Sequence, residues 1–146
     1  MRYFLPLTLF FFLLFASPVP MTAAEEVKSS ESELRGMLET IEKNTPRKLP
    51  TGLGQKRLDK KDLEAARTVF DTSEKILAND NITDEFRIWT LKRKAHALIQ
   101  LAYEETPKHF PLLADVINDL EGKENSGEIL HEAESHLLII GIQIAA

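Results

Sequence analysis

From residue 59 onward, the apolar residues of this chain recur with the spacing of an α-helix. Asp59 is a suitable N-cap for a helix that runs to about Ala78, where the run Asn-Asp-Asn ends the pattern. The apolar face of this predicted helix carries Leu63, Ala66, Val69, Phe70, Ile76 and Leu77.

The next predicted helix, over residues 84–104, has the widest apolar surface of the chain. Thr83 is its expected N-cap, and Asp84 and Glu85 occupy the first turn, where the helix dipole favours carboxylates. Its apolar positions are Ile88, Leu91, Ala95, Leu98, Ile99 and Ala102, widened by Phe86, Trp89, Ala97 and Leu101. Such a wide stripe must be covered from more than one side. We therefore expect this helix at the centre of the domain, with Trp89 and Leu98 buried between helices.

Two further helices follow. Thr106-Pro107 and Phe110-Pro111 both suit a helix start, because proline is tolerated in the first turn, and the pattern ends before Gly122. Ser126 is the expected N-cap of the last helix. The apolar positions of the two helices are Leu113, Val116, Ile117 and Leu120, and then Leu130, Ala133, Leu137, Ile140 and Ile144.

The four helices of residues 59–146 show a repeated apolar pattern. A shift of 43 residues aligns Val69 with Leu112, Phe70 with Leu113, Leu77 with Leu120, Phe86 with Ile129, Ala95 with Leu138 and Leu101 with Ile144. Helical hairpin repeats have periods in this range. The sequence therefore predicts an all-α domain of antiparallel helical hairpins, either a solenoid-like repeat or a four-helix bundle.

The last predicted helix carries apolar residues on most of its circumference. It reads HLLIIGIQIAA over residues 136–146, with no basic last turn and no capping residue. One neighbouring hairpin cannot cover such a surface, and a large exposed apolar patch favours aggregation. We expect a protein partner or a further C-terminal domain to pack on residues 137–146, with self-association as another possibility. We expect Ile139 and Ile142 to lie on the uncovered side of this helix.

Two segments precede this domain in the mature chain. Residues 25–44 form a short amphipathic helix in which Ser30 and Glu33 have the spacing of a capping box. Residues 45–58 contain two prolines and two glycines without periodicity, as is typical of a linker.

The first 24 residues have the order of a secretory signal peptide. Arg2 precedes an apolar run over residues 3–16, and small residues lead to a cleavage site expected after Ala24. A membrane anchor needs about 20 unbroken apolar residues, but this run is shorter and Pro18 and Pro20 follow it. We therefore expect an exported protein, periplasmic or secreted, without a stable membrane span after cleavage.

Composition narrows the class of function. The chain has no cysteine, which excludes thiol chemistry and disulfide stabilisation. Its 18 basic residues become 17 once Arg2 is removed, against 23 acidic residues, so the mature formal charge is −6. This balance argues against nucleic acid as a partner, because nucleic-acid binding needs a clustered basic face.

The histidines do not form a metal-binding pattern. His131 and His136 are five residues apart, so their side chains project about 140° apart around a helix and cannot share a metal as an i, i+4 pair does. Glu128 and His131 form one Glu-x-x-His pair, whereas a di-iron site needs two. We expect surface histidines at both positions and predict no metal ligand, cofactor or catalytic residue.

Residues 60–146 resemble the helical region that precedes the thioredoxin-fold domain in some exported bacterial redoxin proteins. The resemblance rests on the turn KIL…TDE over residues 75–85, the long alanine-containing helix behind it and the second hairpin that ends in EAESHLLIIGIQIA. It implies a thiol–disulfide oxidoreductase as the parent protein. The redox domain and its paired cysteines are absent from this chain, so no catalytic residue is carried over.

Two functions remain open. The chain is either an exported non-catalytic helical module for protein–protein interaction or domain positioning, or the N-terminal helical portion of a thiol–disulfide oxidoreductase.

Overall fold

The structure, a computed structural model, describes residues 22–45 and 58–146. These residues form five α-helices, and no strand occurs among them. The helices are α1 (Ala23–Asn44), α2 (Lys60–Leu77), α3 (Asp84–Glu104), α4 (Thr106–Leu120) and α5 (Gly127–Ala145). The predicted all-α class is therefore confirmed, whereas most of the predicted signal peptide and linker lies outside the described residues.

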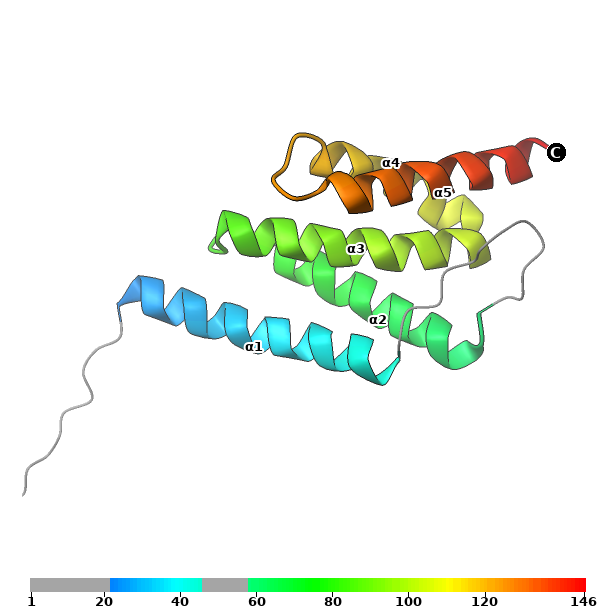
Figure 1. The fold of residues 1–146 in the computed structure, drawn as a ribbon. Coiled ribbons are helices and arrows are strands. Elements are labelled where there is room, and N and C mark those ends of the chain that lie inside the picture. Colours follow the sequence, from blue (N-terminus) through cyan, green and yellow to red (C-terminus); the bar gives the residue numbers. More distant parts are fainter. Residues whose placement is uncertain (1–21, 46–57) are drawn as a thin grey trace, which may run out of the picture.

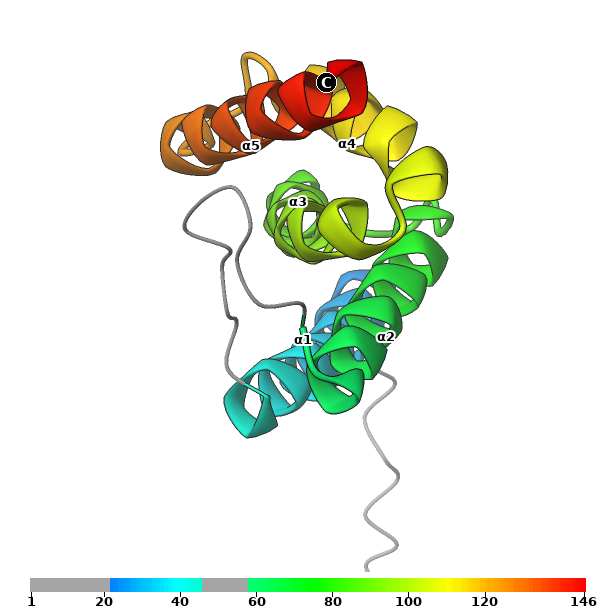
Figure 2. The same cartoon turned by 90° about the vertical axis from the view of Figure 1, so that its right-hand side faces the viewer.

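The five helices are arranged around α3. Figure 1 shows α3 between α2 and the pair formed by α4 and α5, and Figure 2 shows α1 and α2 together on one side of it. The packing of α3 is most extensive with α2 and α4. Its buried residues are Phe86, Thr90, Leu91, Ala95, Ala97, Leu98, Ile99, Gln100, Leu101 and Ala102. The expectation that residues 84–104 form the central helix is confirmed.

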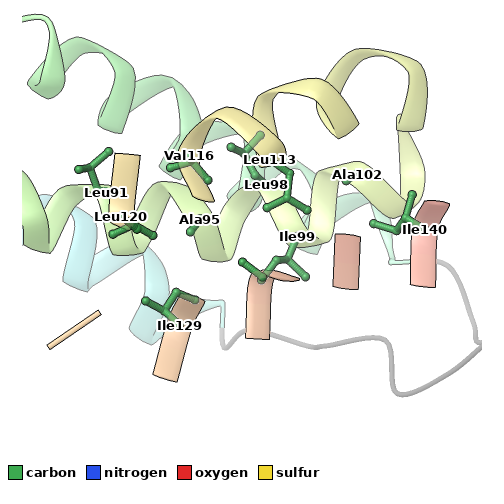
Figure 3. Close-up of a cluster of buried hydrophobic side chains, with 11 residues drawn as sticks. Leu91, Ala95, Leu98, Ile99, Ala102, Leu113, Val116, Leu120, Ile129 and Ile140 are labelled. Carbon is green, nitrogen blue, oxygen red and sulfur yellow. The ribbon is translucent and has the colours of Figure 1, made fainter. Parts of the chain in front are cut away.

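Two clusters of buried apolar side chains meet on α3. Figure 3 shows the larger cluster, which joins α3 to α4 and α5. It consists of Leu91, Ala95, Leu98, Ile99, Ala102, Leu113, Val116, Leu120, Ile129, Ala133 and Ile140. The smaller cluster joins α1, α2 and α3 through Leu38, Val69, Ile76, Phe86 and Ala97. Burial on two opposite sides explains why α3 has little polar surface.

Local capping explains where α2 and α3 begin. The Asp59 carboxylate accepts a hydrogen bond from the backbone N–H of Asp62 at 2.9 Å. In the same way, the Thr83 hydroxyl accepts one from the backbone N–H of Phe86 at 3.2 Å. Each bond satisfies an N–H that has no partner within its helix. Both predicted N-caps are confirmed.

The first helix begins earlier than predicted. Thr22, not Ser30, is its N-cap: the Thr22 hydroxyl accepts from the Glu25 N–H at 3.3 Å, and the Glu25 carboxylate accepts from the Thr22 N–H at 2.9 Å. These two bonds form a capping box eight residues before the one expected at Ser30 and Glu33, and the helix begins at Ala23, two residues before the predicted segment 25–44. The helix therefore includes the peptide bond after Ala24, where signal cleavage is expected.

Two predicted features of the second hairpin differ in the structure. Ser126 precedes α5, but its side chain does not cap that helix. Its hydroxyl instead donates to the Leu120 carbonyl at 3.0 Å and the Lys123 carbonyl at 2.6 Å, which closes the turn after α4. The α4 helix starts at Thr106, so Pro111 lies inside it rather than at its start.

Trp89 is only partly buried, contrary to the sequence expectation. Its ring stacks on Phe86, with ring centroids 5.5 Å apart. The guanidinium carbons of Arg35 and Arg93 lie 4.6 Å and 4.0 Å from its ring centroid. These charged groups keep the indole at the edge of the smaller cluster, because an apolar enclosure would strip the water from both cations.

Candidate functional site

The outward side of α5 is the most apolar exposed surface of the described residues. Leu138 and Ile142 are 67% and 54% exposed, and Ile144 near the end of the helix is 59% exposed. Leu138, Ile142 and Ala145 follow one another at i, i+4 and i+7, so they form one stripe along the helix. We call these three residues the α5 stripe.

The opposite side of α5 holds the helix on the domain. Ile129, Ala133 and Ile140 are buried in the larger cluster, and Figure 3 shows Ile129 and Ile140 beside residues of α3. A Cβ added at Gly141 would lie 3.8 Å from the Phe110 ring, so α5 also approaches α4 closely there. Because the inward side is fully used, the α5 stripe has no neighbour among the described helices.

This outcome changes one detail of the sequence expectation. Apolar residues left exposed near the end of the chain were expected, and they are present. Ile142 is exposed as expected, but the placement of Ile139 on the uncovered side was wrong: Ile139 is half-buried, whereas Leu138 is the most exposed large apolar side chain. The buried residues of α5 determine which of these two side chains is exposed. Ile140 faces the larger cluster, and Leu138, two residues earlier, lies on the opposite side of the helix.

A polar seam lies between α3 and α5. The Tyr103 hydroxyl is 2.8 Å from Nδ1 of His136, and the two rings meet edge to face with centroids 5.6 Å apart. One helix turn away, Nε2 of His96 lies 3.8 Å from the Glu132 carboxylate. Burial raises the pKa of Tyr103, so its hydroxyl stays protonated and available as a hydrogen-bond donor. His136 is therefore half-buried and paired, not the surface histidine expected, while His131 is exposed as expected.

A pocket of about 270 Å³ lies between α1, α2 and α3. Its apolar wall is formed by Ile41, Ala65, Ala66, Val69 and Ala97, and its polar wall by Glu42, Thr45, Asp62, Arg93, His96 and Gln100. Arg93 and Glu42 form an ion pair in its lining, with 3.7 Å between Nε and the carboxylate. Burial lowers the pKa of Arg93, although Glu42 and Glu39 oppose this change. The pocket contains both charge signs.

Several hydroxyl groups of the described helices form hydrogen bonds to the backbone. Hydroxyls of Thr90 and Ser135 donate to carbonyls four residues earlier in their own helices, and the Thr106 hydroxyl at the start of α4 donates to the Ala102 carbonyl of α3. Among residues 22–45 and 58–146, no group of three histidine, aspartate or glutamate side chains could hold a metal ion. None of the five described helices is both long enough and apolar enough to cross a membrane.

His109 is a buried titratable group that the sequence pattern did not reveal. It is 1% exposed and packs edge-on against Phe70, with ring centroids 5.8 Å apart. Its Nδ1 lies 3.3 Å from the Glu105 carbonyl and 3.4 Å from the Glu105 carboxylate, which also pairs with Arg67. Burial lowers the pKa of His109, Lys108 and Arg67 lower it further, and Asp71 opposes them.

We expect His109 to make the domain less stable in mild acid. Its pKa is lower in the folded than in the unfolded chain, so the unfolded chain binds more protons as the pH falls below about 6.5. The stability contributed by the neutral imidazole is complete above that pH and is lost as the pH falls toward the folded pKa. The midpoint temperature of thermal unfolding should fall less between pH 7.5 and pH 5.5 for His109→Gln than for the wild type. The same substitution at exposed His131 is the control, and equal slopes for all three proteins would contradict the assignment.

Comparison with known families, characterised proteins and solved structures gives no match to this chain. The resemblance to the helical region of redoxin proteins therefore stays a prediction. The surfaces of the five described helices are therefore the basis on which the function of this chain is inferred.

Proposed function

We propose that this chain is an exported, non-catalytic helical module that binds another protein through the α5 stripe. The observation that carries the proposal is the exposure of Leu138 and Ile142, at 67% and 54%, on a helix whose other side is fully packed. Each large apolar side chain left in water forgoes about 1.5 to 3 kcal/mol relative to burial. Large exposed apolar patches mark interaction sites in soluble proteins.

The 43-residue correspondence between the two hairpins supports the same surface. Under this correspondence Leu138 of the α5 stripe is equivalent to Ala95 of α3. Ala95 is completely buried, whereas Leu138 is 67% exposed. Ala95 is covered because the following hairpin packs on it. The partner, whether a separate protein or a further domain, would cover α5 as the second hairpin covers α3.

Lysine substitutions on the α5 stripe test this proposal. We expect residues 25–146 to bind a hydrophobic dye and to self-associate through the α5 stripe, and Leu138→Lys with Ile142→Lys to abolish the dye binding and this part of the self-association without loss of helix content. His131→Lys with Ser135→Lys is the matched control, because both positions are exposed on the same helix and receive lysines at the same spacing. Sedimentation velocity and dye fluorescence give the result. A monomeric wild type that binds no dye would rule out the α5 stripe as a docking surface.

Export has its own test. We expect mass spectrometry of the protein recovered from cells to show Glu25, or a residue within two or three positions of it, as the N-terminus. Cleavage there would also remove Thr22 and its capping box, leaving Ser30 and Glu33 to cap a shorter α1. An intact Met1 in the membrane fraction would favour a membrane anchor.

A further inference from the structure

The α1 helix lies on an apolar surface formed by α2 and α3. Leu38 is its one buried residue, and it packs with Val69 and Ile76 of α2 and with Phe86 and Ala97 of α3. Leu34 and Ile41 are only partly buried at the edges of this cluster. Figure 1 shows α1 as the outermost helix on its side of the domain. We call the α2–α3 surface under α1 the α1 groove.

Polar contacts fix the register of α1 in this groove. The Glu31 carboxylate accepts from the backbone N–H of Thr83 at 2.5 Å and from its hydroxyl at 3.0 Å. Arg35 lies over the Trp89 ring, and Glu42 lies 3.7 Å from Arg93. These contacts are spread over about three turns of α1, from Glu31 to Glu42, so the groove is matched in shape and charge to this particular sequence.

The packing of α1 is nevertheless weaker than that of any neighbouring helix. One buried side chain anchors α1, against ten on α3. The end of α1, at Ile41, Glu42 and Thr45, borders the pocket of about 270 Å³ rather than a continuous apolar surface. The larger cluster contains no α1 residue, so α3, α4 and α5 keep their shared core when α1 leaves. Segments with few buried contacts open at lower free energy than the rest of a domain.

We propose that α1 is an exchangeable helix and that the α1 groove accepts α1 of a second copy of this chain. A second copy is the occupant that the contacts favour, because its α1 carries the same Glu31, Arg35, Leu38 and Glu42 at the same spacing. Exchange of an identical element replaces each contact by an equivalent one, so it needs no new interface.

Hydrogen exchange on the wild-type full chain tests the first half of the proposal. Amide groups of α1 should exchange on the order of 100-fold faster than those of α3, through opening of α1 alone. Amide groups of α1 that exchange only as slowly as those of α3 would overturn the proposal. This measurement needs no variant, so it does not depend on whether a substituted chain folds.

Trp89, the only tryptophan of the chain, reports whether the α1 groove is occupied. In a Leu38→Asp chain α1 cannot seat, and the Trp89 emission should shift to longer wavelength. Mixing this chain with an excess of a chain that carries Trp89→Phe and Val69→Asp should restore the wild-type emission, because the α1 of this donor is intact but cannot pack in its own altered groove, and the donor contributes no tryptophan signal. Both chains should also carry Leu138→Lys and Ile142→Lys, so that association through the α5 stripe does not contribute.

The matched control adds Leu38→Asp to the Trp89→Phe chain, which removes the leucine from the donated helix. Recovery with the first donor and none with the control is the expected result, accompanied by a sedimenting species of twice the monomer mass. A peptide of residues 22–45 should restore the emission in the same way. If neither the donor chain nor the peptide changes the emission, the α1 groove does not accept a helix from outside the chain.

Discussion

Replacing Leu98 with alanine should lower the free energy of unfolding by about 3 kcal/mol. Leu98 is completely buried on α3 and belongs to the cluster that joins α3 to α4 and α5. Truncation removes the transfer free energy of the side chain and leaves a cavity that the surrounding helices fill only in part. Leu113 and Val116 of α4 have no exposed surface either, so water cannot enter the vacated space cheaply.

Urea unfolding followed by the circular dichroism of the helices measures this loss. The urea concentration at the midpoint of unfolding should fall. The slope of the free energy of unfolding against urea concentration should stay close to that of the wild type, because the surface exposed on unfolding hardly changes. Glu85→Ala on the same helix is the matched control, since Glu85 is exposed and should cost no more than about 0.5 kcal/mol. If Leu98→Ala proved as mild as this control, the larger cluster would not be the main source of stability.

The parts of the fold that follow from short-range interactions could be predicted from the sequence. The starts of α2 and α3 depend on hydrogen bonds between residues three positions apart, from Asp59 to Asp62 and from Thr83 to Phe86. The central place of α3 follows from the width of its apolar stripe, which no single neighbour can cover. Helix type, number and order in residues 59–146 therefore needed no knowledge of distant contacts.

Competing local signals explain the errors at helix starts. Thr22 with Glu25 and Ser30 with Glu33 both have the capping-box spacing, but the prediction considered only the second pair, because Thr22 was assigned to the signal peptide. The structure forms the first, since a helix from Ala23 keeps every backbone N–H after the first turn bonded along the alanine- and glutamate-rich segment. The Ser126 hydroxyl likewise had two sets of partners available, and the carbonyls at the end of α4 bind it instead of α5.

Side chains whose surroundings come from other helices could not be placed in advance. Trp89 has an apolar position on α3, but Arg35 from α1 and Arg93 from α3 lie over its ring and keep it partly exposed. His109 and His136 look isolated in the sequence. Their partners Phe70 and Tyr103 come from α2 and α3. Each partner is more than 30 residues away in the sequence, so helical periodicity could not indicate the contact.

The α5 stripe could be predicted in part from the sequence, but its exact residues depend on packing against other helices. The apolar content of residues 136–146 predicted that some side chains would stay uncovered, because more of the circumference is apolar than one hairpin can bury. Which side is uncovered depends on how α5 rotates about its axis, and Ile129, Ala133 and Ile140 set that rotation by facing the larger cluster. The stripe could therefore be anticipated, but its residues could be assigned only from the packed helices.

Replacing Phe86 with alanine should be the most destabilising single change in the smaller cluster, at about 3 to 5 kcal/mol. Phe86 is completely buried and packs with Leu38 of α1 and with Val69 and Ile76 of α2. Its ring also stacks on Trp89, so its removal takes away both the filling of the cluster and one face of the indole contact.

The two clusters give this prediction a second, independent readout. Loss of Phe86 weakens the seat of α1 directly, so hydrogen exchange of α1 should accelerate more than that of α4 and α5, and the Trp89 emission should move to longer wavelength. Leu98→Ala, which acts on the other cluster, should lower overall stability without that selective acceleration, because Leu98 has no part in the smaller cluster. Equal acceleration across all five helices in both variants would mean that the two clusters unfold as one unit and that α1 has no separate opening.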